Sequence, residues 1–120
     1  MTYETYPMVH LPRGEHPTYS NMPKEYSCLG CPNCKGYNMH HIRARVSFRR
    51  EDSNEGVYAD LAKDGVLTGR TQQFNPSARR SGLLIDFWCE DCNEYSLFAL
   101  AQHKGLSLMY WADPKDYKDE

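Results

Sequence analysis

Long hydrophobic runs are missing from this sequence of 120 residues. No stretch approaches the ~18 consecutive apolar residues that a transmembrane helix requires, so no membrane association is expected. The first seven residues lack the basic and then apolar pattern of a secretory signal peptide. Hydrophobic residues still make up 40% of the chain and aromatic residues 12%, which excludes a disordered protein. We therefore expect one soluble, cytoplasmic domain.

Several catalytic signatures are also missing. The sequence has no glycine-rich phosphate-binding loop, no Gly-x-Ser-x-Gly and no His-Glu-x-x-His. Neither Cys-x-x-Cys pair is preceded by the His-x-Glu of a zinc deaminase. These absences favour a non-catalytic binding protein. The alternative is an anion site with a nearby thiol, which Arg70, Arg79, Arg80 and His103 could form.

A large excess of either charge is absent, since the formal net charge is −2. The charges are nevertheless segregated. Residues 35–80 contain nine Lys or Arg and five Asp or Glu, a net of +4, whereas residues 81–120 contain three and eight, a net of −5. A basic middle segment in an acidic chain predicts a contact there with an acidic partner, and solvated surface charge is the alternative.

Cysteine, in contrast, is present in a pattern typical of metal sites. Cys31 and Cys34 form one Cys-x-x-Cys pair, and Cys89 and Cys92 form another after 54 intervening residues. Two residues between cysteines let a tight turn aim both sulfurs at one point, and zinc takes four such ligands tetrahedrally. The spacing predicts one structural Zn²⁺ on these four residues, which would help to stabilise so small a chain. Cys28 is expected to remain a spare thiol.

Other uses of these cysteines are weighed against zinc. Disulfides are disfavoured by the expected reducing compartment and by the odd number of cysteines. A redox pair would need only one Cys-x-x-Cys, normally in a βαβ context, which is not indicated. An iron–sulfur cluster also uses four cysteines. A second metal would require His10, His40 or His41 in addition to Cys28.

The residues around the two pairs carry a resemblance. Cys31-Pro32-Asn33-Cys34-Lys35-Gly36 resembles the first knuckle of a zinc ribbon, and the segment from Phe87 to Asn93 resembles the second. The resemblance covers roughly residues 28–52 and 82–111. It implies a mostly β, antiparallel zinc-ribbon-type sheet whose knuckles cap hairpins, and a metal with a structural role. Zinc ribbons occur in transcription factors, ribosomal proteins and small adaptors, so the resemblance implies no single function.

Three segments are expected along the chain. Residues 1–27 hold four of the seven prolines and four tyrosines, which predicts an extended N-terminal arm that lies on its own domain or docks on a partner. Residues 28–112 form the zinc-ribbon β domain. Residues 113–120 form an acidic C-terminal tail that is expected to fray.

Alternating polarity predicts the strands. From Met39 to Arg50, one face carries Ile42, Ala44, Val46 and Phe48 and is expected to be buried, and the other carries His41, Arg43, Arg45, Ser47 and Arg49 and is expected to meet solvent. Residues 57–67 are expected to form a hairpin with a turn at Asp64-Gly65. Further strands are expected at 83–88, 95–102 and 106–111, of which 95–102 also suits a helix.

The expected partner surface is basic. Arg43, Arg45 and Arg49, extended by Arg79 and Arg80, would contact nucleic acid or an acidic protein surface through their planar guanidinium groups. Tyr37, Phe74 and Trp88 would stack on unpaired bases. The sequence thus predicts a small intracellular zinc-ribbon protein with a nucleic-acid-associated or regulatory role. The alternative is an adaptor or inhibitor of a larger complex, and a homodimer is possible.

Overall fold

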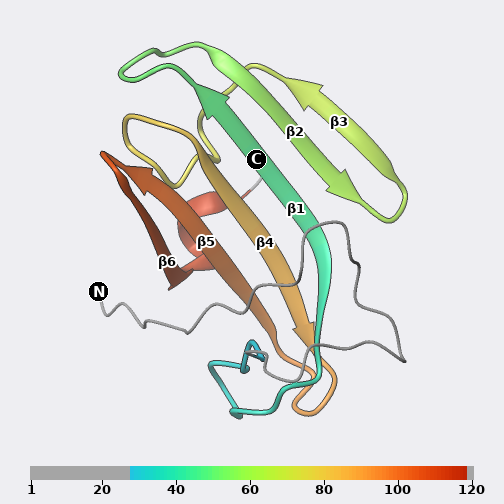
Figure 1. Ribbon diagram of the computed structural model, residues 1–120. Helices are drawn as coiled ribbons and strands as arrows, with labels where there is room; N and C mark the ends of the chain where they lie inside the picture. Colours follow the sequence, from blue (N-terminus) through green and yellow to red (C-terminus); the bar gives the residue numbers. More distant parts are fainter. Residues whose placement is uncertain (1–27, 119–120) are drawn as a thin grey trace, which may run out of the picture.

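One antiparallel sheet of six strands dominates the computed structural model, which describes residues 28–118 (Figure 1). The strands lie in the order β3-β2-β1-β4-β5-β6. Their bounds are β1 (Met39–Arg49), β2 (Gly56–Ala62), β3 (Gly65–Gly69), β4 (Gly82–Cys89), β5 (Tyr95–His103) and β6 (Leu106–Ala112), followed by a short 3-10 helix, η1 (Pro114–Tyr117). The predicted antiparallel β fold is confirmed, including the strand at 95–102. The predicted arm of residues 1–27 lies outside the described residues.

The pairing of the two central strands places the cysteine pairs at one end of the sheet. β1 and β4 pair antiparallel from Met39 opposite Cys89 to Ser47 opposite Gly82. The first Cys-x-x-Cys precedes β1, and the second forms the connection from β4 to β5. Antiparallel pairing therefore brings both knuckles to the lower end of the sheet in Figure 1.

The segment between the knuckles enlarges the sheet. β2 and β3 form the predicted hairpin, and β2 pairs with the side of β1 opposite to β4. Ala62 pairs with Gly65, which makes Lys63-Asp64 the two-residue turn, one position before the predicted one. Gly65 follows the turn with a φ of 152°, a backbone conformation that L residues rarely adopt.

The predicted facing of β1 is wrong. Arg45 and Ser47 are 3% and 0% exposed, whereas Ile42 and Phe48 are 42% and 58% exposed. The arginine side of β1 belongs to the covered face of the sheet, which is overlaid by residues 70–81 and η1. The aliphatic side belongs to the open face. Alternation identifies the two sides of a strand, but it does not tell which side a remote loop will cover.

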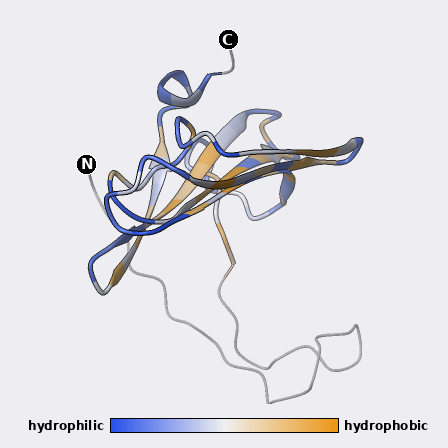
Figure 2. Cartoon of the chain, turned by 90° about the horizontal axis from the view of Figure 1, so that it is seen from above, coloured by the Kyte–Doolittle hydropathy of each residue, from blue (hydrophilic) through white to orange (hydrophobic). Residues whose placement is uncertain are grey.

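The core lies on the covered face. Its buried members come from β2, the loop 70–81, β4 and β5, and they are Tyr58, Phe74, Leu84, Leu97 and Ala99. Tyr110 and Tyr117 pack against them from β6 and η1. In Figure 2, η1 stands on one side of the sheet. The core is thus a thin layer between the sheet and two short irregular covers.

The start of the C-terminal segment is ordered, contrary to the expected fraying. Asp113 caps η1, because its side chain accepts a hydrogen bond of 2.9 Å from the amide of Lys115, and Pro114 begins the helix. The carbonyl of Tyr117 accepts a hydrogen bond of 2.8 Å from the Arg45 side chain. Among residues 28–118, no helix combines the length and apolar character needed to cross a membrane.

Candidate metal centre

The four predicted ligands converge on one point. The Sγ atoms of Cys31 and Cys92 are 3.7 Å apart, and those of Cys34 and Cys89 are 3.6 Å apart. All four sulfurs lie within 4.8 Å of one another. An ion bound tetrahedrally at about 2.3 Å from each sulfur sets neighbouring sulfurs about 3.8 Å apart. The cluster therefore has the size and the donor set of a four-thiolate metal site.

The two knuckles share one backbone conformation. In the first, the amide of Lys35 donates to the carbonyl of Cys31 at 2.9 Å, and Lys35 has a φ of 68°. In the second, the amide of Asn93 donates to the carbonyl of Cys89 at 2.8 Å, and Asn93 has a φ of 62°. Apart from their cysteines the two turns have different sequences. The common geometry thus aims the two sulfurs of each turn at one point.

Backbone amides stabilise the thiolates of the first knuckle. The amide of Asn33 points at the sulfur of Cys31, and the amide of Gly36 points at the sulfur of Cys34, each at 3.4 Å. These donors supply partial positive charge to sulfurs that must carry negative charge when they bind a metal. These amides thereby favour the thiolate form, which is the form that binds a metal.

Side chains between the knuckles fix their relative position. Asn38 donates its side-chain amide to both carboxylate oxygens of Asp91, at 3.1 and 3.3 Å. The amide of Glu90 donates to the carbonyl of Asn38 at 3.0 Å. A Cβ on Gly36 would collide with the Asp91 carboxylate, so only glycine fits there without displacing this contact. The residues Asn38, Gly36 and Asp91 thus clamp the two halves of the site.

The pKa values of Cys31 and Cys92 are shifted in opposite directions. Burial opposes ionisation of Cys31, but hydrogen bonds from the backbone of Cys34 and Asn33 outweigh it and lower its pKa to about 7. At Cys92 a backbone hydrogen bond favours the thiolate, yet burial and the neighbouring sulfurs raise its pKa to about 12. Four thiolates at this distance require a cation to neutralise them. The donor chemistry therefore fits a bound divalent metal.

Cys28 and the histidines do not form a second site. The Cys28 side chain is exposed, and among the described residues the four-sulfur cluster is the sole group of three or more metal-binding side chains. His40 instead contacts the Glu90 carboxylate through Nε2 at 3.1 Å and lies 5.3 Å from the Trp88 ring. His10 falls outside the described residues.

The five predicted partner-binding arginines are engaged within the protein. Arg43 donates from Nε to Asp60 at 2.9 Å and forms an ion pair with it, and this hydrogen bond lowers the pKa of Asp60. Arg45 contacts Asp86 at 3.4 Å from its buried position. Burial raises the pKa of Asp86 despite this neighbour. The expected solvent-facing row of arginines on β1 is thus wrong.

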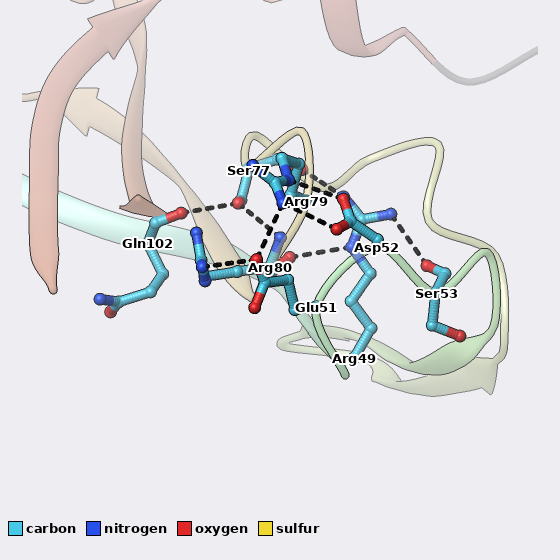
Figure 3. A network of polar contacts seen from close by, with 8 residues as sticks. All are labelled: Arg49, Glu51, Asp52, Ser53, Ser77, Arg79, Arg80 and Gln102. Carbon is cyan, nitrogen blue, oxygen red and sulfur yellow. Dashed lines mark hydrogen bonds and ion pairs between the residues drawn. The ribbon is translucent and has the colours of Figure 1, made fainter. Parts of the chain in front are cut away.

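Arg49 joins a network at the end of the sheet opposite the knuckles (Figure 3). Its guanidinium donates to the carbonyls of Arg80, Ser77 and Ser53, at 3.0, 2.7 and 3.3 Å. The hydroxyl of Ser77 donates to the carbonyl of Gln102 at 2.7 Å. Arg49 therefore holds the loop 70–81 against the sheet.

Arg79 and Arg80 neutralise acidic residues in the same network. Arg79 pairs with Asp52 at 2.6 Å and with Glu51 at 2.8 Å, and Arg80 pairs with Glu51 at 2.9 Å. The hydrogen bond from Arg79 lowers the pKa of Asp52. The carboxylates of the polar turn after β1 thus offset much of the positive charge predicted for this surface.

Two residues of the metal centre were missed by the sequence analysis. Asn38 and Asp91 clamp the knuckles, yet neither has a spacing that would distinguish it from an ordinary surface residue. Gly36 did carry a signal, because glycine shortly after the second cysteine is part of the knuckle pattern. No protein-family model, curated protein or solved structure matches the chain, so the functional assignment rests on the geometry described above.

Proposed function

We propose that this chain is a small, non-catalytic binding protein stabilised by one Zn²⁺ ion. The observation that carries the proposal is the set of four cysteine sulfurs within 4.8 Å of one another. A catalytic zinc generally keeps one position for water or substrate, and four cysteine ligands leave none. The metal then stabilises the fold, and the protein functions by binding a partner through its surface.

The surface that suits a partner best is the knuckle end. Tyr37 and Tyr95 are 69% and 67% exposed there, beside the exposed acidic residues Glu90, Asp91 and Glu94. Zinc with four thiolates adds a net charge of −2 to the same end. Aromatic rings among negative charges attract Arg and Lys side chains through cation–π and ionic contacts. A basic protein segment is therefore the proposed partner.

This proposal favours the adaptor alternative over nucleic-acid association. Binding to phosphates requires accessible cations. Arg45 is buried, Arg43 and Arg49 are half-buried, and Arg79 and Arg80 face carboxylates. The acidic knuckle end would repel a nucleic acid. The aromatic residues at this end thus support a protein partner of opposite charge.

Fluorescence anisotropy of the zinc-loaded full chain tests the proposal. The probes are a labelled arginine-rich peptide, an acidic peptide of equal length and a single-stranded oligonucleotide. We expect binding of the arginine-rich peptide alone, weakened by salt. Tyr95→Ser and Glu94→Gln should reduce it, and Leu106→Ser, an exposed position at the far end of β6, should not. Binding of the oligonucleotide without the basic peptide would overturn the proposal.

A further inference from the structure

The open face of the sheet exposes a strip of apolar side chains on β1, β2 and β3. The loop 70–81 and η1 both pack on the covered face. The strip consists of Ile42, Phe48, Val57, Leu61 and Val66, which are 40–64% exposed. Side chains of this kind gain about 25 cal/mol per Å² of area removed from water. Covering this strip with another apolar segment would therefore be favourable.

Two hollows shape the strip into a groove. One, of about 730 Å³, is lined by residues that include His41, Ala44 and Leu61, toward the knuckle end. The other, of about 460 Å³, is lined by residues that include Val46 and Phe48, farther along β1. We call the two hollows together the β1–β3 groove. Its floor is mostly apolar, and Arg43, which also lines the first hollow, is paired with Asp60.

The two ends of the groove differ in their balance of charge. At the knuckle end, the hairpin turn contributes Lys63 and Asp64. At the far end, the exposed side chains of Arg50 and Arg70 lie beside Phe48 and outnumber the one exposed carboxylate there, Glu55. Nine residue steps of β1 separate His41 from Arg50, which corresponds to about 30 Å. An occupant should therefore have an uncharged stretch of about this length.

The chain itself contains such a stretch within residues 1–27. The run Thr5-Tyr6-Pro7-Met8-Val9-His10-Leu11-Pro12 has no Lys, Arg, Asp or Glu and is bounded by Glu4 and Arg13. Nine residue steps separate these two charges, about 28–30 Å in an extended or polyproline conformation. The fifteen residues from Arg13 to Cys28 span up to about 50 Å. That reach exceeds the longest dimension of the structure, 44 Å.

We propose that residues 5–12 dock in the β1–β3 groove of their own chain. The excess of arginine at the far end sets the direction, so that Glu4 lies beside Arg50 and Arg70 and Arg13 lies at the hairpin turn. Tyr6 and Met8, two residues apart and so on one side of an extended segment, supply apolar side chains to the hollows. Proline lacks an amide donor, so Pro7 and Pro12 bury no unpaired N–H. The tether raises the local concentration of the segment above that of a free partner. This inference goes beyond the proposed partner at the knuckle end.

Methyl NMR of the full, zinc-loaded chain with ¹³C-labelled methionine tests the docking. We expect nuclear Overhauser effects from the Met8 methyl to Phe48 and Val57, and none from Met22, which lies in the tether. These effects should persist on dilution, and light scattering should give the mass of a monomer. Phe48→Ser should abolish them and return the Met8 methyl to its random-coil shift.

Matched variants separate docking from a change in fold. Leu67→Ser removes a side chain that is 68% exposed on the other side of β3, and it should leave the Met8 signals unchanged. Tyr6→Ser should release Met8 without altering any residue of the sheet. A random-coil Met8 methyl in the unmodified chain overturns the proposal. So does a dimer whose contacts vanish on dilution, because the occupant is then a second copy.

Discussion

The guanidinium of Arg45 lies over the ring of Phe74, with its central carbon 5.3 Å from the ring centroid. The same side chain donates a hydrogen bond to the carbonyl of Tyr117 in η1. One residue on β1 thus contacts both covers of the core, the loop 70–81 and the C-terminal 3-10 helix. Burying a cation normally costs free energy, but here the Arg45 side chain connects the two covers of a thin core.

Arg45→Ala should lower the free energy of unfolding by about 3 kcal/mol, because it leaves Asp86 and the Tyr117 carbonyl without their donor and opens space beside Phe74. Urea denaturation of the metal-loaded protein measures the change. Arg70→Ala, at an exposed position, should shift it by less than about 0.5 kcal/mol. Equal effects of the two variants would show that Arg45 does not fasten the covers.

Replacing any one of Cys31, Cys34, Cys89 and Cys92 by Ser should lose the metal and the cooperative unfolding transition, because the ion connects distant parts of the chain. Elemental analysis should give one zinc per chain for the parent protein. Cys28→Ser is the control and should retain both the metal and the transition. Loss of metal from the Cys28 variant would place that thiol among the ligands.

Gly36→Ala should weaken metal binding at least about tenfold, because the new methyl group displaces the Asp91 carboxylate and separates the knuckles. Asp91→Ala in the same chain should restore much of the loss, since the obstructing carboxylate is then gone. Competition with a chromophoric chelator measures both affinities. Gly105→Ala has no atom within 4 Å of its added Cβ and should have no effect. Failure of the second substitution to rescue the first would exclude the collision as the cause.

Arg49→Lys should cost about 1.5–3 kcal/mol of stability, because an ammonium group cannot reproduce the fork that reaches three carbonyls. Arg79→Lys affects an exposed pair in the same network and should cost no more than about 1 kcal/mol. Thermal unfolding of the two variants side by side compares them. The reverse order of stabilities would contradict the role given to Arg49.

Metal affinity should fall steeply as the pH falls from 8 to 6. Without metal, the raised pKa values of Cys34 and Cys92 keep both thiols protonated in this range, and the ion must displace these protons to bind. These two protons alone correspond to a loss of about 100-fold per pH unit, and the slope steepens toward pH 6 because Cys31, whose pKa is about 7, then also binds a proton. Chelator competition at several pH values measures the slope. A flat profile would mean that the thiols are already ionised.

The sequence predicted the elements whose cause is local. Alternation located β1 and β4, and the cysteine spacing identified all four sulfurs that the structure brings together. The sequence did not predict the features that depend on contacts between residues far apart along the chain. Which side of β1 is buried depends on Phe74 and Tyr117, which lie far along the chain and have no periodic relation to Arg45. Asp91 likewise supports the site because the fold places it against Gly36, and the spacing of residues in the sequence does not predict that contact.

The knuckles close a loop that runs from β1 to β4 and includes the β2–β3 hairpin. The tip of that hairpin, Lys63-Asp64, projects from the edge of the sheet, and Gly69 at the end of β3 has no neighbouring atom near its Cβ position. Lengthening a flexible loop adds little closure entropy, about 0.6 kcal/mol for each doubling. The hairpin is thus a region where the chain can grow or accept a grafted segment while the metal centre at the other boundary of the loop stays the same.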